Sequence, residues 1–167
     1  GLFHLKLYGL GMADKPDPKA PMTYARYLAL DQLLDCQHPQ SDLDDEMLFI
    51  IIHQTKELWL KQIIRELQLA RSQIRNDALV PAYKALARVS RIQAVMTLSW
   101  DVLSTMTPSE YTRFRHVLGP SSGFQSDQFR TVEYLLGLKA SAFLKYQEDR
   151  PDAHAAMTDA LINPSIW

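Results

Sequence analysis

The feature that most constrains this sequence is a strongly apolar segment, residues 46–61, that contains one histidine. Residues 47–52 form the longest unbroken apolar run in the chain, and His53 follows directly. On an α-helix, residues four apart lie on one face, so Phe49, His53 and Glu57 line up. A helix this apolar over its first half is expected to be buried on most sides. The segment therefore predicts a helix around which the rest of the chain is organised.

A lone histidine in such a segment has two interpretations. His53 can be a core residue whose ring nitrogens bind neighbouring polar groups. It can also belong to a binding or catalytic site, an interpretation that requires a second cluster of suitable residues elsewhere in the chain.

Composition excludes several classes of protein. With 167 residues, of which 47% are hydrophobic and 22% charged, the chain is long enough for one domain with a substantial core. A net charge of -1 gives no electrostatic basis for binding nucleic acid or an anionic membrane. No apolar run reaches the roughly 20 residues of a membrane-spanning helix, and no secretory signal pattern is present. The single cysteine, Cys36, excludes an intrachain disulfide, and we expect a cytoplasmic protein.

Proline content divides the chain into two parts. Residues 1–21 are predicted to be an N-terminal tail and a proline-rich connector, because prolines placed among Asp and Lys prevent a helix. Residues 22–167 are predicted to be the helical domain. Its first helix starts at the N-cap Thr23 and continues through apolar positions to Leu34.

Two long helices are expected next. Ser41 and Asp42 suit the cap of the helix that carries His53, which should extend to about Ile74. Pro81 suits the first turn of the following helix. The apolar positions of that helix recur every three or four residues, at Tyr83, Leu86, Ala87, Val89, Ile92, Val95, Met96, Trp100 and Leu103. Because apolar residues nowhere alternate with a period of two, we predict an all-α fold, a bundle of long helices.

The clearest local signal is a capping box formed by Thr107 and Glu110, with a proline at the first helical position. The short helix that it starts is expected to stop at Gly119. Tyr111 and Arg115, four residues apart, should therefore lie on one face of a helix that is bounded at both ends.

A polar loop, residues 121–126, follows this helix and contains Ser122 and Gly123. The loop is consistent with a ligand-binding surface and equally with a plain turn between helices. Its serines suit the cap of a further helix that should end at Gly137. Near the end of the chain, Asn163 has the form of an N-cap followed by proline, and we expect the polypeptide to continue past Trp167.

Several chemistries find no support among the residues. The histidines and Cys36 are too dispersed for a zinc site, and no Glu-x-x-His motif of a di-iron bundle occurs. A Gly-x-Ser-x-Gly elbow and a phosphate-binding glycine loop are also missing from the sequence. Common hydrolase, nucleotide-binding and metal-centre interpretations therefore fail.

The remaining candidates together describe a site for an aromatic amino acid. Arg115 with Tyr111 suits a carboxylate, because the guanidinium binds it with two parallel hydrogen bonds and the phenol adds a donor. Phe49 beside a neutral His53 suits a flat ring that has an N–H to donate. Taken alone, the Tyr111–Arg115 pair is equally consistent with a solvated pair on a helix surface.

Three stretches, in this order, resemble tryptophan 2,3-dioxygenase in its bacterial form: residues 22–34, residues 45–61 with HQTKELWLK, and residues 107–126 with TPSEY and GPSSGFQS. The resemblance runs from about Met22 to Lys139. It implies a homotetrameric, all-helical enzyme with haem b (Fe²⁺) that adds O₂ across the indole C2=C3 bond of L-tryptophan. The product would be N-formylkynurenine, in the first step of tryptophan degradation by the kynurenine route. A relative that oxidises another indole, or a haem-free helical interaction module, is the alternative.

The resemblance also implies roles for single residues. His53 would be the catalytic residue, distal to the haem, and would accept the indole N–H while Phe49 packs on the indole. Tyr111 and Arg115 would bind the substrate carboxylate. The residues implied to lie against the haem are Phe49, Trp100, Ser122 and Gly123, and the last two would also lie beside the substrate.

Other implied features lie beyond a single chain. Tyr24, Tyr27 and Leu28 match N-terminal residues that the family donates to a neighbouring subunit's pocket, so the site would be composite. The family's axial histidine and a threonine near the substrate ammonium lie downstream of the matched stretches and have no counterpart in this chain. The iron ligand is therefore expected beyond Trp167, and this chain by itself is expected to hold no metal ligand.

Overall fold

The computed structural model describes residues 21–166, which fall into two compact units that divide between Cys36 and Gln37. All the regular secondary structure of the described residues is helical, which confirms the all-α prediction. The predicted tail, residues 1–21, lies almost wholly outside the described residues. The predicted boundary after residue 21 stays a prediction.

The first unit contains two short helices, α1 (Tyr24–Tyr27) and α2 (Leu30–Leu33). Thr23 caps α1 as predicted, because its Oγ1 accepts the Arg26 N–H at 3.2 Å. The prediction of one continuous helix to Leu34 is wrong. Ala29, between α1 and α2, has a left-handed backbone with φ of 50°. Alanine rarely adopts this conformation, so the residue type gave no indication of a break.

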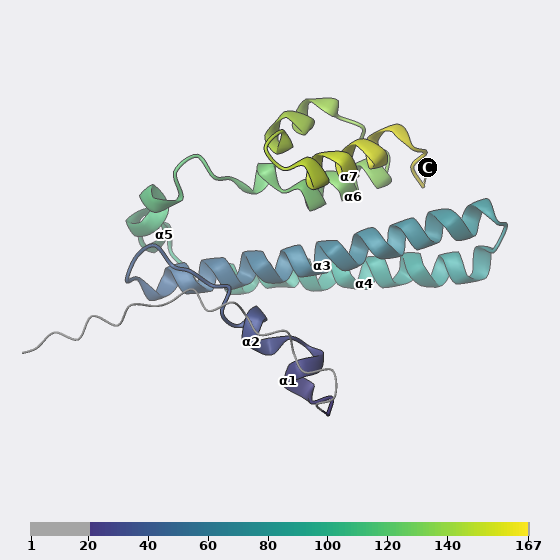
Figure 1. Ribbon diagram of the computed structural model, residues 1–167. Coiled ribbons are helices and arrows are strands. Elements are labelled where there is room, and N and C mark those ends of the chain that lie inside the picture. The colour runs from purple at the N-terminus through teal and green to yellow at the C-terminus, as the bar shows by residue number, and fades with distance from the viewer. Residues whose placement is uncertain (1–20, 167) are drawn as a thin grey trace, which may run out of the picture. The chain divides into compact units, whose positions relative to one another are not determined.

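The second unit is built on a hairpin of two long helices, α3 (Asp44–Arg75) and α4 (Leu79–Leu103), which lie side by side (Figure 1). The turn between them contains Asp77, whose φ is 56°. The remaining elements are α5 (Pro108–Arg115), η1 (His116–Leu118), η2 (Gly123–Gln125), α6 (Asp127–Leu135), η3 (Ser141–Gln147) and α7 (Pro151–Ile162). The two long helices confirm the predicted bundle, whereas the short 3₁₀ segments were not predicted.

The start of α3 differs from the prediction, because Leu43 and neither Ser41 nor Asp42 occupies the N-cap. The buried Glu46 carboxylate instead reaches back to the preceding chain. It accepts the backbone N–H groups of Gln40 at 2.8 Å and Ser41 at 2.7 Å, and also the Ser41 hydroxyl. These hydrogen bonds hold the pKa of Glu46 below its ordinary value.

The hydrophobic core lies along the second half of α3, where α4, α6 and α7 pack (Figure 1). Its buried residues are Leu60, Ile63, Leu67, Val89, Ile92, Val132, Tyr134, Leu135, Met157 and Ala160. The first half of α3 is not buried on most sides, contrary to the prediction: Ile51, Leu58 and Trp59 are each more than 40% exposed in the described chain. Apart from the long helix α4, the elements that cover α3 are short, and α6 and α7 contribute their core residues beside its second half.

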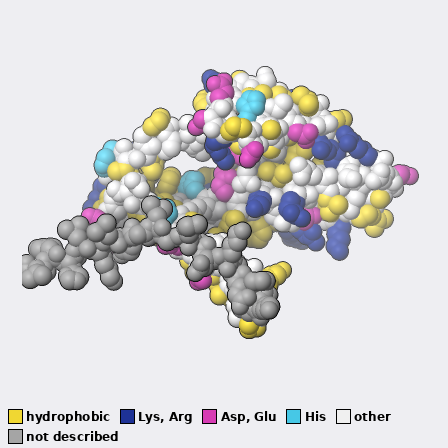
Figure 2. All heavy atoms as spheres, viewed as in Figure 1, with side chains coloured by type: hydrophobic (Ala, Val, Ile, Leu, Met, Phe, Trp, Pro, Cys, Tyr) yellow, Lys and Arg dark blue, Asp and Glu magenta, His cyan; other side chains and the backbone are white. Residues whose placement is uncertain are grey.

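The face of α4 that packs on α3 is displaced from the predicted stripe. Ala82 and Ala85 are buried together with Val89 and Ile92, whereas Tyr83 and Trp100 are exposed. The alanines allow the two helices to lie close together, since the distance between packed helices depends on the side chains at the contact. Hydrophobic side chains also reach the surface near the turn of the hairpin, where Val80 is exposed (Figure 2).

The helices after the polar loop are bounded largely as predicted. Ser126 caps α6, and Gly137, with φ of 107°, follows the end of that helix. Asn163 closes α7 and does not start a helix within the described residues. Lys139 binds the carbonyl oxygens of Ala160 and Asn163, and so ties this end of α7 to the segment after α6.

Candidate functional site

A cavity of about 730 Å³ lies at the first half of α3, bordered by the end of α4, by α5 and by the loop that follows α5. In the space-filling view the molecule is hollowed beside α5, over this part of α3 (Figure 2). The cavity is lined by Phe49, His53, Glu57, Trp100, Leu103, Met106, Thr107, Pro108, Tyr111, Arg115, Leu118, Ser121, Ser122, Gly123, Gln125 and Ser126. Seven of the residues predicted from the sequence are therefore brought to one cavity: Phe49, His53, Trp100, Tyr111, Arg115, Ser122 and Gly123.

Helix α5 is held at its start by the predicted capping box, which the structure confirms. Thr107 Oγ1 accepts the Glu110 N–H at 3.3 Å, and Glu110 Oε2 accepts the Thr107 N–H at 2.7 Å. Phe114, three residues after Tyr111, is fully buried, and its ring lies 5.7 Å from that of Phe49 in an edge-on arrangement. The cap fixes the start of α5, and Phe114 fixes α5 against α3.

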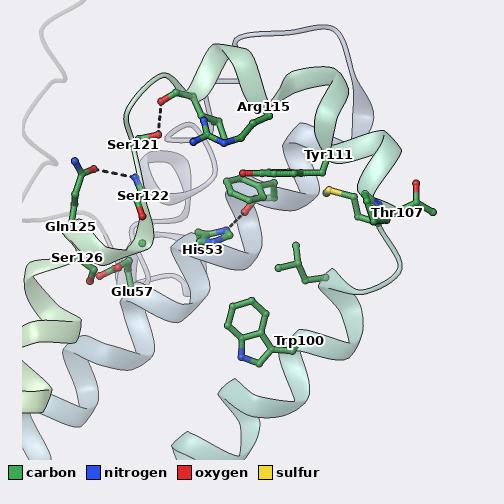
Figure 3. Close-up of a pocket in the computed structure, with 16 residues that line it drawn as sticks. His53, Glu57, Trp100, Thr107, Tyr111, Arg115, Ser121, Ser122, Gln125 and Ser126 are labelled. Atoms are coloured by element: carbon green, nitrogen blue, oxygen red, sulfur yellow. Dashed lines mark hydrogen bonds between the residues drawn. The ribbon is translucent and has the colours of Figure 1, made fainter.

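The side chains of Tyr111 and Arg115 project from α5 toward the cavity (Figure 3). Arg115 Nη1 donates to the carbonyl oxygen of Gly119 at 2.9 Å. Gly119 has a left-handed φ of 55°, which glycine adopts at little cost and which ends the helical segment. A guanidinium has five N–H donors, so this one contact orients Arg115 and leaves donors for a ligand. Tyr111 and Arg115 are thus a half-buried pair at the cavity wall and not a solvated pair on a helix surface.

His53 is oriented by its own helix. Its Nδ1 lies 2.7 Å from the carbonyl oxygen of Phe49, and a carbonyl oxygen can only accept, so Nδ1 carries the hydrogen. In the neutral ring Nε2 is then the acceptor. The rings of Phe49 and His53 are 4.1 Å apart, and the Tyr111 ring lies 5.8 Å from Phe49. This group combines flat apolar surface with one hydrogen-bond acceptor.

The loop before α6 uses its polar groups to build its own backbone. Ser122 Oγ accepts the Phe124 N–H, and the Ser122 N–H is donated to Gln125 Oε1 at 3.1 Å (Figure 3). These bonds define the short helix η2, which the loop prediction missed. Ser122 and Gly123 nevertheless line the cavity, so a role in ligand binding stays a prediction.

A second cavity of about 670 Å³ adjoins the first. Both are lined by His53, Glu57, Trp100, Ser122, Gly123 and Ser126. The walls that belong to the second cavity alone are Lys56, Leu60, Gln93, Met96, Thr97, Phe124, Phe129 and Arg130. His53 and Trp100 thus border two spaces, each large enough for an organic ligand.

Several residues of these walls were not predicted as site residues, among them Glu57 and Lys56. Glu57 lines both cavities, and its carboxylate accepts the side-chain N–H of Gln128 at 2.8 Å, which links α3 to α6. Its position one turn after His53 was the available signal. Lys56 lines the second cavity, and nothing in its sequence spacing distinguished it from the other lysines of the chain.

Three predicted residues belong to the first unit. Tyr24 and Tyr27 lie on α1, and Leu28 is its C-cap. The side chains of both tyrosines are exposed in the described chain. Their contribution to a neighbouring subunit's pocket stays a prediction.

Two kinds of feature are absent from the described residues, a cluster of metal ligands and a membrane-spanning helix. Residues 21–166 contain no group of three or more His, Cys, Asp or Glu side chains that could hold a metal ion. In the same part of the chain, no helix has both the length and the apolar character needed to cross a membrane.

Comparison with known proteins gives one family. The sequence model of tryptophan 2,3-dioxygenase matches residues 12–165. The chain is 64% identical over 146 residues to the tryptophan 2,3-dioxygenase of Caulobacter vibrioides, which covers 87% of this chain and 56% of that protein. It is 53% identical over 151 residues to the protein of that name from Bacillus thuringiensis, covering 90% of this chain and 54% of the relative. The chain spans about half the length of the curated relatives that it matches.

Proposed function

The chain belongs to the tryptophan 2,3-dioxygenase family, and on this premise we propose that the whole protein inserts O₂ across the indole C2=C3 bond of L-tryptophan, giving N-formylkynurenine. One observation carries the proposal: a single cavity wall combines an aromatic surface with a hydrogen-bond acceptor, and a tyrosine–arginine pair lies beside it. This combination matches the indole ring, the indole N–H and the carboxylate of the substrate.

The cavity residues would act by binding and orientation. Arg115 and Tyr111 would hold the carboxylate, and Phe49 would pack on the indole. Nε2 of His53 would accept the indole N–H, because Nδ1 is already bound to the Phe49 carbonyl. Rate acceleration would therefore come from fixing one ring face in place, not from a strong acid or base.

The second cavity fits haem b in the character of its walls. Leu60, Met96 and Phe129 offer apolar surface for a flat ring. The ammonium of Lys56, which has no hydrogen-bond partner in the described part of the chain, offers a partner for a carboxylate. Trp100, Ser122 and Gly123 border both cavities and would lie between cofactor and substrate. When bound, haem supplies the iron that activates O₂.

The proposal extends to assembly and location. We expect a cytoplasmic homotetramer in which Tyr24, Tyr27 and Leu28 complete the pocket of a neighbouring subunit. The exposed tyrosine side chains of α1 are consistent with a contact outside their own unit.

The function is tested on the full-length protein loaded with haemin, reduced, and supplied with L-tryptophan and ¹⁸O₂. We expect a Soret band and a product that carries both labelled atoms. Absence of the band and of the product would favour a haem-free interaction module. Turnover of other indoles without turnover of L-tryptophan would favour a family relative that oxidises a different indole.

A further inference from the structure

Lys56 lines the second cavity. None of the catalytic and substrate-binding roles proposed above uses its ammonium group. Its Nζ is shielded from solvent and has no hydrogen-bond partner among residues 21–166. It lies 2.9 Å from the centre of the Trp100 ring. The positive charge is therefore stabilised by a cation–π interaction with the face of the Trp100 indole.

The other charged side chains of this cavity are satisfied. Arg130 forms an ion pair with Glu133 at 2.6 Å and also donates to the carbonyl of Phe124. Glu57 accepts from the Gln128 side chain at 2.8 Å. Among the described residues that line the second cavity, Lys56 is therefore the charged group without a hydrogen bond or an ion pair.

An unpaired buried ammonium is costly to maintain. Burial lowers the pKa of Lys56, because the charged form loses its hydration. Contact with an aromatic face offsets only part of that loss. A ligand carboxylate within reach of Nζ would replace the lost hydration with a charge-assisted hydrogen bond. The surrounding walls are mainly apolar, so the ligand should have an apolar body and at least one acidic group at its edge.

We propose that Lys56 binds a carboxylate of the ligand that fills the second cavity, and that for haem b this group is a propionate. The inference rests on the proposed function, since it takes haem to be that ligand. The carboxylate of L-tryptophan is the other source of the same chemistry. Arg115 and Tyr111 are available to it in the first cavity, which Lys56 does not line. Lys56 is thus a positioning residue for the cofactor.

The experiment compares two ligands that differ only in their carboxylates. The full-length apoprotein is titrated with haemin and with haemin dimethyl ester, and binding is followed by the Soret band. Lys56→Met removes the ammonium and keeps an apolar chain of similar length. Lys61→Met is the matched control, because Lys61 is exposed on the same helix and lines neither cavity.

We expect Lys56→Met to weaken haemin binding by roughly tenfold to a hundredfold, the range for a hydrogen bond between charged groups. Binding of the ester should be nearly unchanged, and Lys61→Met should alter neither. If Lys56→Met does not fold, Lys56→Gln is used, and the same selective loss is expected.

Three results would overturn the inference. Equal weakening for haemin and ester would mean that Lys56 supports the fold. Unchanged haemin affinity would mean that no propionate reaches it. A loss of L-tryptophan affinity with haemin affinity unchanged would assign Lys56 to the substrate. A parent protein that binds neither haemin nor its ester would instead contradict the proposed function.

Discussion

The two halves of α3 share one apolar pattern but differ in what covers them. In the second half, Leu60, Ile63 and Leu67 are at most 5% exposed and belong to one hydrophobic core with residues of α4, α6 and α7. In the first half, Phe49 and His53 are only half-buried and face cavities. Apolar periodicity therefore identifies a helix face but not its use, which depends on whether other elements fill the space beside it.

This difference separates stability from binding along a single helix. Substitutions in the second half should change the free energy of unfolding, because they remove buried contacts. Substitutions of the cavity-lining residues in and around the first half should change ligand affinity and turnover with little effect on unfolding. The predictions below test this division, beginning with the largest effect.

The largest effect is expected in the covered half. Leu67 is fully buried, so Leu67→Ala should destabilise the protein by about 2 to 5 kcal/mol through lost contacts and a residual cavity. Leu69 is 47% exposed two residues later, and Leu69→Ala should cost less than about 0.5 kcal/mol. Urea unfolding of the full-length protein measures both. Similar costs for the two variants would show that the second half of α3 is not the core.

The next effect concerns α5, on the wall of the open half. Arg115→Lys keeps the charge but loses the planar fork, so we expect a loss of roughly 1.5 to 3 kcal/mol in transition-state stabilisation. This corresponds to about tenfold to a hundredfold or more in kcat/KM for L-tryptophan. The measurement requires full-length enzyme loaded with haem.

Tryptamine, which lacks the carboxylate, is the control substrate for Arg115. It should be a poor substrate for the parent protein and should lose little further activity in the variant. If the variant lost activity on both substrates in equal proportion, Arg115 would support the fold or haem binding and would not bind the substrate carboxylate.

The elements that could be predicted from sequence were those whose signals are local. The capping box at Thr107, the length of α3 and the placement of Tyr111 and Arg115 on one bounded helix follow from spacing and from residue type. His53 and Phe49 were identifiable because four residues separate them on a helix. These are properties of one segment at a time.

The features that could not be predicted depend on contacts between segments. Glu46 looked like an ordinary acidic residue of a first helical turn, but it binds the chain that precedes the helix. Lys56 had no distinguishing signal in the sequence, and its ammonium comes to lie over the Trp100 ring because α4 packs on α3. The break at Ala29 has no counterpart in residue type.

A smaller effect is expected at the histidine of the open half. His53→Ala should leave the unfolding free energy nearly unchanged and remove one neutral hydrogen bond, worth about 0.5 to 1.5 kcal/mol. L-tryptophan should lose activity in the variant by roughly twofold to tenfold more than its indole N-methyl analogue, which has no N–H to donate. Equal losses on both substrates would remove the hydrogen-bond role, and a large loss of stability would place His53 with the core.

The smallest effect concerns Glu46, a buried charge that ties the start of α3 to the chain before it. Glu46 accepts three hydrogen bonds from Gln40 and Ser41, and Glu46→Gln keeps an acceptor oxygen but loses the charge. We expect it to lower the free energy of unfolding by roughly 0.5 to 1 kcal/mol at neutral pH.

The pH dependence distinguishes this charge effect from simple packing. The pKa of Glu46 is lowered in the folded protein, so its contribution is present above the ordinary carboxyl pKa of 4.5 and is lost as pH falls through the lower folded value. Unfolding free energies measured from pH 7 downward should therefore converge for the parent protein and Glu46→Gln in acid. Asp44→Asn is the matched control, because Asp44 is an exposed carboxylate in the same helical turn. If the gap between the parent and Glu46→Gln stayed constant with pH, or if Asp44→Asn showed the same convergence, the stabilisation would not come from the buried carboxylate. The start of α3 would then be held by its other contacts and not by the charge of Glu46.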